Sequence, residues 1–188
     1  MEVHQLAVGP MQNFSYLVAS GKECLLIDPG WDHERIKSVI QEDGLVLKYV
    51  ILTHSHYDHV QELSHFLAYQ DVSIVAWRDS PLNPSVSVGE DTVLPLGDTE
   101  VRFIHTPGHV PDQICVLVDG NLFTGDTLFV SRIGRTDLPG GDSAQMEESL
   151  DKLRKLPPET IVWPGHDYGP KKHSTIGDEI KENPYLRF

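Results

Sequence analysis

The sequence predicts an α/β sandwich of three or four layers, built by one domain that spans residues 1–188. The first observation is the order of the elements: short apolar runs of strand length alternate with segments of helical periodicity. The second is continuity, because neither a Pro-rich or Ser-rich linker nor a change of composition divides the chain. The third is that the polar motifs follow strand-like runs, where side chains from several strands can converge on one point.

The first elements predict an antiparallel meander followed by a helix. Three strand-like runs, residues 2–8, 14–20 and 24–29, are separated by the turn signals Gly9-Pro10 and Gly21. Residues 31–43 have the apolar spacing of a helix, and Gly44 lies just beyond its expected end.

A buried strand and a second helix come next. Residues 47–52 are nearly all apolar, which is typical of a strand buried on both faces. This strand leads directly into the segment THSHYDH. From His59 we expect a helix whose apolar side carries four residues, namely Val60, Leu63, Phe66 and Leu67.

The second half of the chain repeats this alternation. Residues 78–98 are rich in Pro, Gly, Ser and Asp and indicate loop with short strands, whereas 143–156 are expected to form a helix with Met146, Leu150 and Leu153 on one face. The tail predicts a short helix that ends near Pro184. Further strands are expected at 73–77, 99–105, 113–118, 121–126 and 160–163.

Composition and charge narrow the class of function. Hydrophobic residues make up 39% and charged residues 23%, as in an ordinary globular protein. The formal net charge of −13 disfavours nucleic acid and anionic membranes as partners, so a small-molecule substrate is expected. The N-terminus has no basic segment followed by an apolar run, so a cytoplasmic location is expected. Cys24 and Cys115 lie in apolar runs and are expected to be buried thiols.

The segment H-x-H-x-D-H provides the strongest chemical signal. Residues two apart in an extended segment point the same way, so His54 and His56 can bind one ion. The chain then turns into a helix, where Asp58 and His59 can face a second ion. Imidazole together with carboxylate suits Zn, Fe or Mn rather than Ca or Mg. The alternative, a polar helix start with Asp58 as its N-terminal cap, leaves three histidines within six residues unexplained.

Three later segments supply further candidate ligands. His109 lies in HTPGH, Asp126 lies in TGDTLF, and His166 lies in WPGHDYG. Each follows an apolar strand-like run, and a nearby glycine lets the backbone pack closely. A carboxylate has two oxygens and can bridge two ions, which suits Asp126.

This order of motifs, from H-x-H-x-D-H through PGH and GD to a second PGH, resembles that of the metallo-β-lactamase superfamily. The resemblance covers nearly the whole chain from Asp28 onward. It implies a four-layer αββα sandwich with two divalent metals, zinc first and iron or manganese as alternatives. One metal is expected on His54, His56 and His109. The implied ligands of the other are Asp58, His59 and His166, with Asp126 bridging the pair.

Within the superfamily, the segment Gly134–Asp142 and the tail look like those of glyoxalase II and its short single-domain relatives. The implied reaction is hydrolysis of a thioester such as S-lactoylglutathione, in which a metal-bridging hydroxide attacks the carbonyl. Asp126 and Asp58 are the expected catalytic residues, because one bridges the ions and the other could donate a proton. The resemblance also makes Arg135 and Tyr168 candidate substrate contacts, although Arg135 could instead pair with an aspartate of its own loop.

Two departures from the glyoxalase II pattern weaken the case for glutathione. The chain stops before the helical C-terminal domain of the long form, and Gln113 stands where relatives often have a further histidine. The main alternative is a persulfide dioxygenase with one iron on His54, His109 and Asp126. A further alternative is a thioesterase for acyl-CoA or another thioester.

The remaining histidines are expected to lie outside the site. His105 competes with His109 within HTPGH, but the family pattern selects His109 as the ligand. Asp28 is expected to orient a ligand rather than bind metal. Four histidines match no motif and are expected to be surface or hydrogen-bonded residues: His4, His33, His65 and His173.

Overall fold

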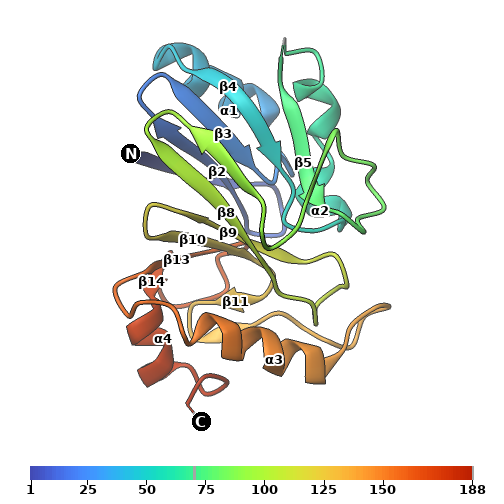
Figure 1. The fold of residues 1–188 in the computed structure, drawn as a ribbon, viewed down its shortest axis with the longest axis vertical. Coiled ribbons are helices and arrows are strands. Elements are labelled where there is room, and N and C mark those ends of the chain that lie inside the picture. Colours follow the sequence, from blue (N-terminus) through green and yellow to red (C-terminus); the bar gives the residue numbers. More distant parts are fainter. Residues whose placement is uncertain (70, 188) are drawn as a thin grey trace.

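The computed structural model describes residues 1–69 and 71–187, and two six-stranded sheets dominate it (Figure 1). The first sheet has the order β1-β2-β3-β4-β5-β6 and the second β14-β13-β10-β9-β8-β7. The first sheet contains β1 (Glu2–Val8), β2 (Asn13–Ser20), β3 (Glu23–Ile27), β4 (Val46–Ile51), β5 (Ser73–Trp77) and β6 (Val86–Val88). The second contains β7 (Val93–Leu96), β8 (Thr99–His105), β9 (Ile114–Val118), β10 (Asn121–Gly125), β13 (Ile161–Pro164) and β14 (Ser174–Thr175).

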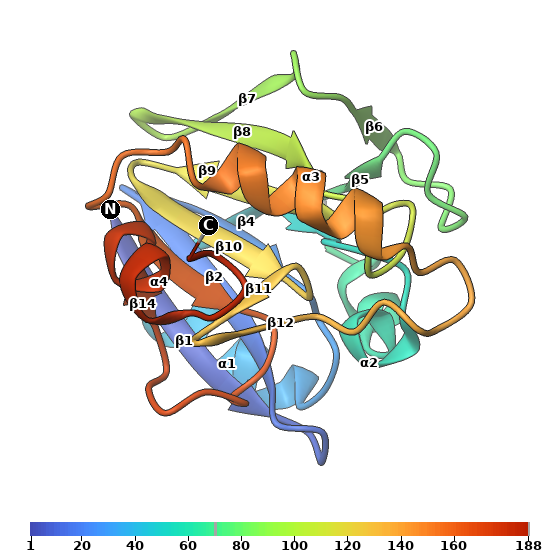
Figure 2. The ribbon, with the colours of Figure 1, turned by 90° about the horizontal axis from the view of Figure 1, so that it is seen from below.

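Helices cover the outer faces of both sheets. Helix α1 (His33–Glu42), the single turn α2 (Tyr57–Val60) and the 3₁₀ turn η1 (Leu63–Phe66) accompany the first sheet. Helices α3 (Ser143–Leu153) and α4 (Ile176–Glu182) cover the second, and Figure 2 shows α3 lying across it. None of the helices in the described ranges is both long and apolar enough to cross a membrane.

Three apolar layers hold this arrangement together. The central layer lies between the sheets and joins Phe14, Tyr16 and Ile51 of the first to Phe103 and Phe123 of the second. A second layer packs the other face of the first sheet against α1 and η1, and a third packs the second sheet against α3 and α4. Residues alternate between faces along a strand, so one strand serves two layers. The four-layer αββα sandwich is therefore confirmed.

Most of the expected elements are confirmed. Strands β1, β2 and β3 pair antiparallel as a meander, and β4 runs parallel to β3 and β5. The helix expected at 31–43 forms as α1, and the helix expected at 143–156 forms as the shorter α3. Asp142 begins α3, because its carboxylate accepts hydrogen bonds from the backbone N–H groups of Ala144 and Gln145.

The prediction of a continuous helix from His59 is wrong. The chain forms only the turn α2 and, after a break, η1. The N–H of Glu62 donates to the carbonyl of Pro29 rather than to that of Asp58, and the Asp58 carbonyl accepts from the side chain of Asn13. Tertiary hydrogen bonds thus replace the helical one. Leu67, expected on the apolar side, is 60% exposed.

A small hairpin completes the fold beside the second sheet. It pairs β11 (Leu128–Phe129) with β12 (Arg132–Ile133), two strands that the sequence did not predict. The turn between them contains Ser131, which has a positive φ of 60°. Its N–H donates to the Glu179 carboxylate at 2.9 Å, which ties the hairpin to α4.

Candidate metal centre

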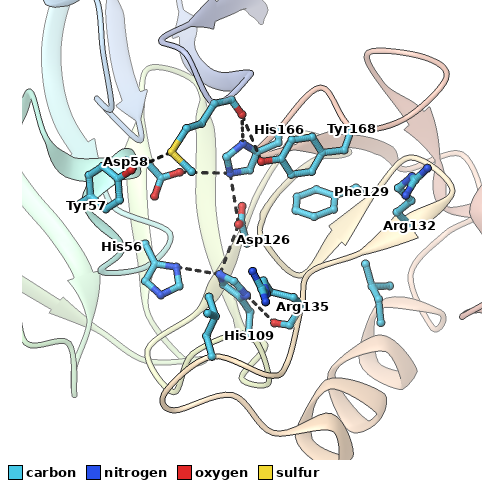
Figure 3. Close-up of a pocket in the computed structure, with 13 residues that line it drawn as sticks. His56, Tyr57, Asp58, His109, Asp126, Phe129, Arg132, Arg135, His166 and Tyr168 are labelled. Carbon is cyan, nitrogen blue, oxygen red and sulfur yellow. Dashed lines mark hydrogen bonds and ion pairs between the residues drawn. The ribbon is translucent and has the colours of Figure 1, made fainter.

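The seven predicted ligands converge where strands of the two sheets end. His54 and His56 follow β4, Asp58 and His59 lie in or beside α2, and His109 follows β8. The last two, Asp126 and His166, follow β10 and β13, which run parallel and therefore end at the same edge. Figure 3 shows His56, His109, Asp126 and His166 pointing toward one another. Four chain segments, residues 54–59 and those around His109, Asp126 and His166, thus bring polar side chains to one point.

Three histidines form the first ligand set. Nitrogen atoms of His54, His56 and His109 all lie within 4.8 Å of one another. Nε2 of His109 lies 2.9 Å from Nδ1 of His56, and the two rings meet edge to face. His54 packs edge-on against both rings. Such a cluster of imidazole nitrogens suits one transition metal ion.

Asp58, His59 and His166 form the second set, again with ligand atoms within 4.8 Å. Asp126 lies between the two sets. Its Oδ2 is 3.4 Å from Nε2 of His109 and 3.4 Å from Nε2 of His166. Its Oδ1 is 3.3 Å from Nε2 of His59. This position suits a carboxylate that bridges two ions.

The side chains fit metal ions in a further respect, because some buried polar atoms lack partners. Nε2 of His54 and Oδ1 of Asp126 find no hydrogen-bond partner among the described residues. Buried nitrogen and oxygen atoms without partners are rare in folded proteins. Metal coordination would satisfy both atoms.

The charge states of His54 and Asp126 also favour metal binding. Burial, reinforced by the neighbouring His59, lowers the pKa of His54 well below its ordinary value, so its imidazole is neutral. Burial alone would raise the pKa of Asp126, but His59 and His166 hold it well below its ordinary value. A neutral imidazole and an ionised carboxylate are the forms that bind metal.

Hydrogen bonds from behind orient the ligands. Asp28 accepts a 2.9 Å hydrogen bond from Nδ1 of His59 and two more from the backbone N–H and hydroxyl of Thr53. Nδ1 of His109 donates to the carbonyl of Arg135, and Nδ1 of His166 donates to that of Met11. These partners aim Nε2 at the centre. Asp28 therefore lies where it can orient His59, as the sequence predicted.

A cavity of about 510 Å³ opens over the candidate metal centre. Its polar floor includes His56, Asp58, His109, Asp126 and His166. Its wall is mostly apolar or aromatic and consists of Met11, Tyr57, Phe129, Ile133, Leu138 and Tyr168, together with Arg132 and Arg135. Both predicted substrate contacts, Arg135 and Tyr168, line this cavity.

The two arginines differ in their ion pairing. Arg135 forms a two-bonded ion pair with Asp137, at 2.7 and 2.8 Å, so the alternative of pairing within its own loop is also realised. Arg132, which the sequence did not single out, has no ion pair within the described part of the chain. The one sequence feature that could have indicated Arg132 is its position just before the segment Gly134–Asp142. His105 lies away from the centre, stacked on Trp77 with Nε2 bonded to the Pro111 carbonyl.

Comparison with known proteins agrees with this fold and site. A model of the metallo-β-lactamase superfamily matches residues 8–77 and 75–166. The probable metallo-hydrolase YqgX of Bacillus subtilis is 32% identical over 99% of this chain and 98% of its own length. The hydroxyacylglutathione hydrolase of Xanthomonas axonopodis pv. citri is 37% identical over 81% of this chain but only 59% of its own length.

A solved structure gives the same result. ETHE1 from Myxococcus xanthus superposes with a TM-score of 0.91 at 32% identity, covering 98% of this chain and 84% of that one. The structure is an αββα sandwich with a histidine-rich candidate metal centre at the ends of its strands. The chain belongs to the metallo-β-lactamase superfamily, as a metal-dependent hydrolase.

Proposed function

We propose that the chain hydrolyses the thioester of a small glutathione conjugate, such as S-lactoylglutathione, with two zinc ions. The observation that carries this proposal is the pair of ligand sets joined through Asp126 at the floor of a cavity large enough for a small molecule. The similarity to a hydroxyacylglutathione hydrolase over 81% of the chain supports the substrate class.

Each metal would have its own side chains. His54, His56 and His109 would hold one ion, and Asp58, His59 and His166 the other, with Asp126 shared. Two such ions supply Lewis acidity, which lowers the pKa of a water and polarises a carbonyl. Donor sets of imidazole and carboxylate favour zinc, with iron or manganese as substitutes.

The protein's own residues position the reaction. Asp58 lines the cavity, and its Oδ2 accepts a 2.9 Å hydrogen bond from Asn13, which fixes the carboxylate. In this position it can donate or accept a proton beside the substrate carbonyl. A thiol leaving group has a pKa near 8.5 and needs little help from an acid. Among the described residues that line the cavity, the only carboxyl groups are those of Asp58 and Asp126. Such a site suits a thioester better than an amide.

The wall of the cavity suits a substrate with an apolar middle and an anionic end. Phe129, Ile133, Leu138 and Tyr168 offer apolar surface. On a chain of net charge −13, an anion needs a local cation. Asp137 already neutralises Arg135, so Arg132 is the better partner for a carboxylate of the substrate.

The experiment compares two reactions of the purified protein. We expect zinc-loaded protein to hydrolyse S-lactoylglutathione. The loss of thioester absorbance measures this reaction. The same side chains could hold a single iron in the dioxygenase alternative, so oxygen uptake with glutathione persulfide is measured on iron-loaded protein. Hydrolysis without oxygen uptake supports the proposal, whereas oxygen uptake without hydrolysis overturns it. Acetyl-CoA as a third substrate distinguishes glutathione thioesters from acyl-CoA thioesters.

A further inference from the structure

A second cluster of metal-ligating side chains lies outside the cavity. His33 begins α1, Glu62 follows α2, and His65 lies in η1. These residues take no part in the candidate metal centre, and none of them lines its cavity. Two nitrogens and one carboxylate oxygen of the cluster nevertheless lie within 4.8 Å of one another.

One carboxylate oxygen holds the cluster together. Oε2 of Glu62 is hydrogen-bonded to Nδ1 of His33 and lies 3.4 Å from Nε2 of His65. On the other side of the His33 ring, Nε2 lies 2.8 Å from a carboxylate oxygen of Glu34. Each nitrogen of His33 thus faces a carboxylate, and Glu62 is the carboxylate that His33 shares with His65. Glu62 itself is only 18% exposed, and the tertiary bond from its N–H to Pro29 fixes its backbone.

The charges in this cluster favour a bound cation. The rings of His33 and His65 are stacked, with centroids 3.6 Å apart and planes 5° from parallel. Two protonated imidazoles at this distance would repel each other, because like charges interact strongly at short range. A divalent cation bound by Glu62 would supply the positive charge without requiring either ring to carry a proton.

The donor set also indicates which cation. Two imidazoles and one carboxylate suit zinc and neighbouring transition metals, whereas calcium and magnesium prefer oxygen alone. Glu62 and His65 are three residues apart, so their side chains lie on the same side of a helical turn. His65 is 45% exposed at its side chain, which leaves its ring free to turn so that Nε2 faces an ion.

We propose that His33, Glu62 and His65 form a separate zinc site. The ion would join the start of α1 to η1, two elements linked in the described structure by the contacts of Glu62. Its ligands are more exposed than those of the candidate metal centre, so it should bind zinc more weakly. The proposal is independent of the reaction at the main centre.

Zinc binding tests the proposal directly. Chelator-treated protein is dialysed against a series of zinc concentrations, and bound zinc per chain is measured by mass spectrometry. We expect the wild type to bind one more equivalent than His65→Ala or Glu62→Gln at high zinc, with equal binding at low zinc. His173→Ala is the matched control, because His173 lies elsewhere, with its ring tilted against that of Trp163. It should bind as many equivalents as the wild type.

A melting experiment provides the second readout. Once zinc has filled the main centre, further zinc should raise the Tm of the wild type and of His173→Ala again. The reason is that a ligand that binds only the folded state stabilises that state. His65→Ala and Glu62→Gln should lack this second rise. Circular dichroism checks that the variants fold. Equal zinc stoichiometry in the wild type and in folded His65→Ala or Glu62→Gln would overturn the proposal.

Discussion

Histidine ligands depend on the atoms behind them as much as on their own nitrogens. His59, His109 and His166 each use Nδ1 to bond an oxygen of the protein, and two of those oxygens are backbone carbonyls. Asp28 is the exception, because it bonds His59 through a side chain that mutation can change. The Asp28 carboxylate also accepts hydrogen bonds from the backbone N–H and the hydroxyl of Thr53, which precedes His54 in the chain. One carboxylate thus positions ligands of both sets.

We expect Asp28→Asn to weaken metal binding by roughly 10–100-fold, because an amide cannot accept all three of these hydrogen bonds. Competition with a chromophoric chelator measures the affinity. Asp32→Asn is the control, since Asp32 lies four residues away and its side chain does not cap α1. Unchanged metal affinity in a folded Asp28→Asn variant would argue against the positioning role.

The two arginines of the cavity should differ in their effect on substrate binding. We expect Arg132→Gln to raise KM for S-lactoylglutathione more than Arg135→Gln does, because Asp137 already pairs with Arg135. A neutral thioester, such as an N-acetylcysteamine thioester, should show no change in either variant. Steady-state kinetics separate KM from kcat. A larger effect at Arg135 would instead favour Arg135, the candidate substrate contact that the family resemblance implied.

At the scale of residues, the sequence indicated which side chains would lie close together but did not indicate the cavity above them. H-x-H-x-D-H is compact and can be recognised from spacing alone. The cavity wall combines Met11 with Phe129 and Leu138, and nothing in those segments marks them as neighbours. His33 and His65 were expected to be surface or hydrogen-bonded residues, and His33 does bond Glu62. Their stacking on each other was not predicted, because the two residues are far apart in sequence and meet through α1 and η1.

Among the elements, those with strong local signals were predicted and the one that depends on tertiary bonds was not. The helix ending before Gly44 and the helix beginning at Asp142 have end signals in their own sequence. The break after α2 does not, because Pro29 and Asn13 supply its hydrogen bonds from other segments. Periodicity alone therefore extended that helix too far.

Helix α3 offers a test of its N-terminal cap. Asp142→Ala removes the acceptor of two backbone N–H groups and should lower Tm by about 2–4 °C, whereas Asp142→Asn keeps a cap and should change Tm little.

The same cap predicts a pH dependence. Hydrogen bonds from Gln145 and Ala144 lower the pKa of Asp142, so its contribution is present above the ordinary carboxyl pKa and is lost as pH falls through the lowered value. Thermal melts from pH 7 to pH 3 should therefore bring the wild type closer to Asp142→Ala. A constant difference would contradict the charged cap.

The whole molecule is held by three apolar layers, and its two cysteines report on two of them. Cys24 packs in the layer beside α1, and Cys115 packs in the layer beside α3. Both side chains are fully buried. Burial raises the pKa of the Cys24 thiol to about 12 and that of Cys115 to about 11.

We therefore expect neither thiol to react with Ellman's reagent at pH 8 in the native protein, because the reactive thiolate is suppressed and inaccessible. Both should react once guanidinium unfolds the chain. The time course of absorbance at increasing denaturant measures this. Rapid reaction of one thiol in native buffer would contradict this, because it would show that the apolar layer around that cysteine admits the reagent.

The layered architecture was predicted at this scale because alternating strands and helices leave few alternatives. The pairing of the strands into two sheets of six was beyond the sequence, since β7 to β10 carry no signal that separates them from β1 to β6. What places the site is nevertheless simple. Parallel strands end at one edge, and the ligands follow those ends.

The central claim is that seven side chains form one two-metal hydrolytic centre, and metal content measured beside turnover tests it most directly. Gel-filtered wild type is expected to retain two zinc ions per chain and to hydrolyse S-lactoylglutathione. His56→Ala removes a ligand of the first set and should lose metal and turnover together, with kcat/KM reduced about 10²-fold or more. A folded His56→Ala variant with two bound zinc ions and full turnover would contradict the account.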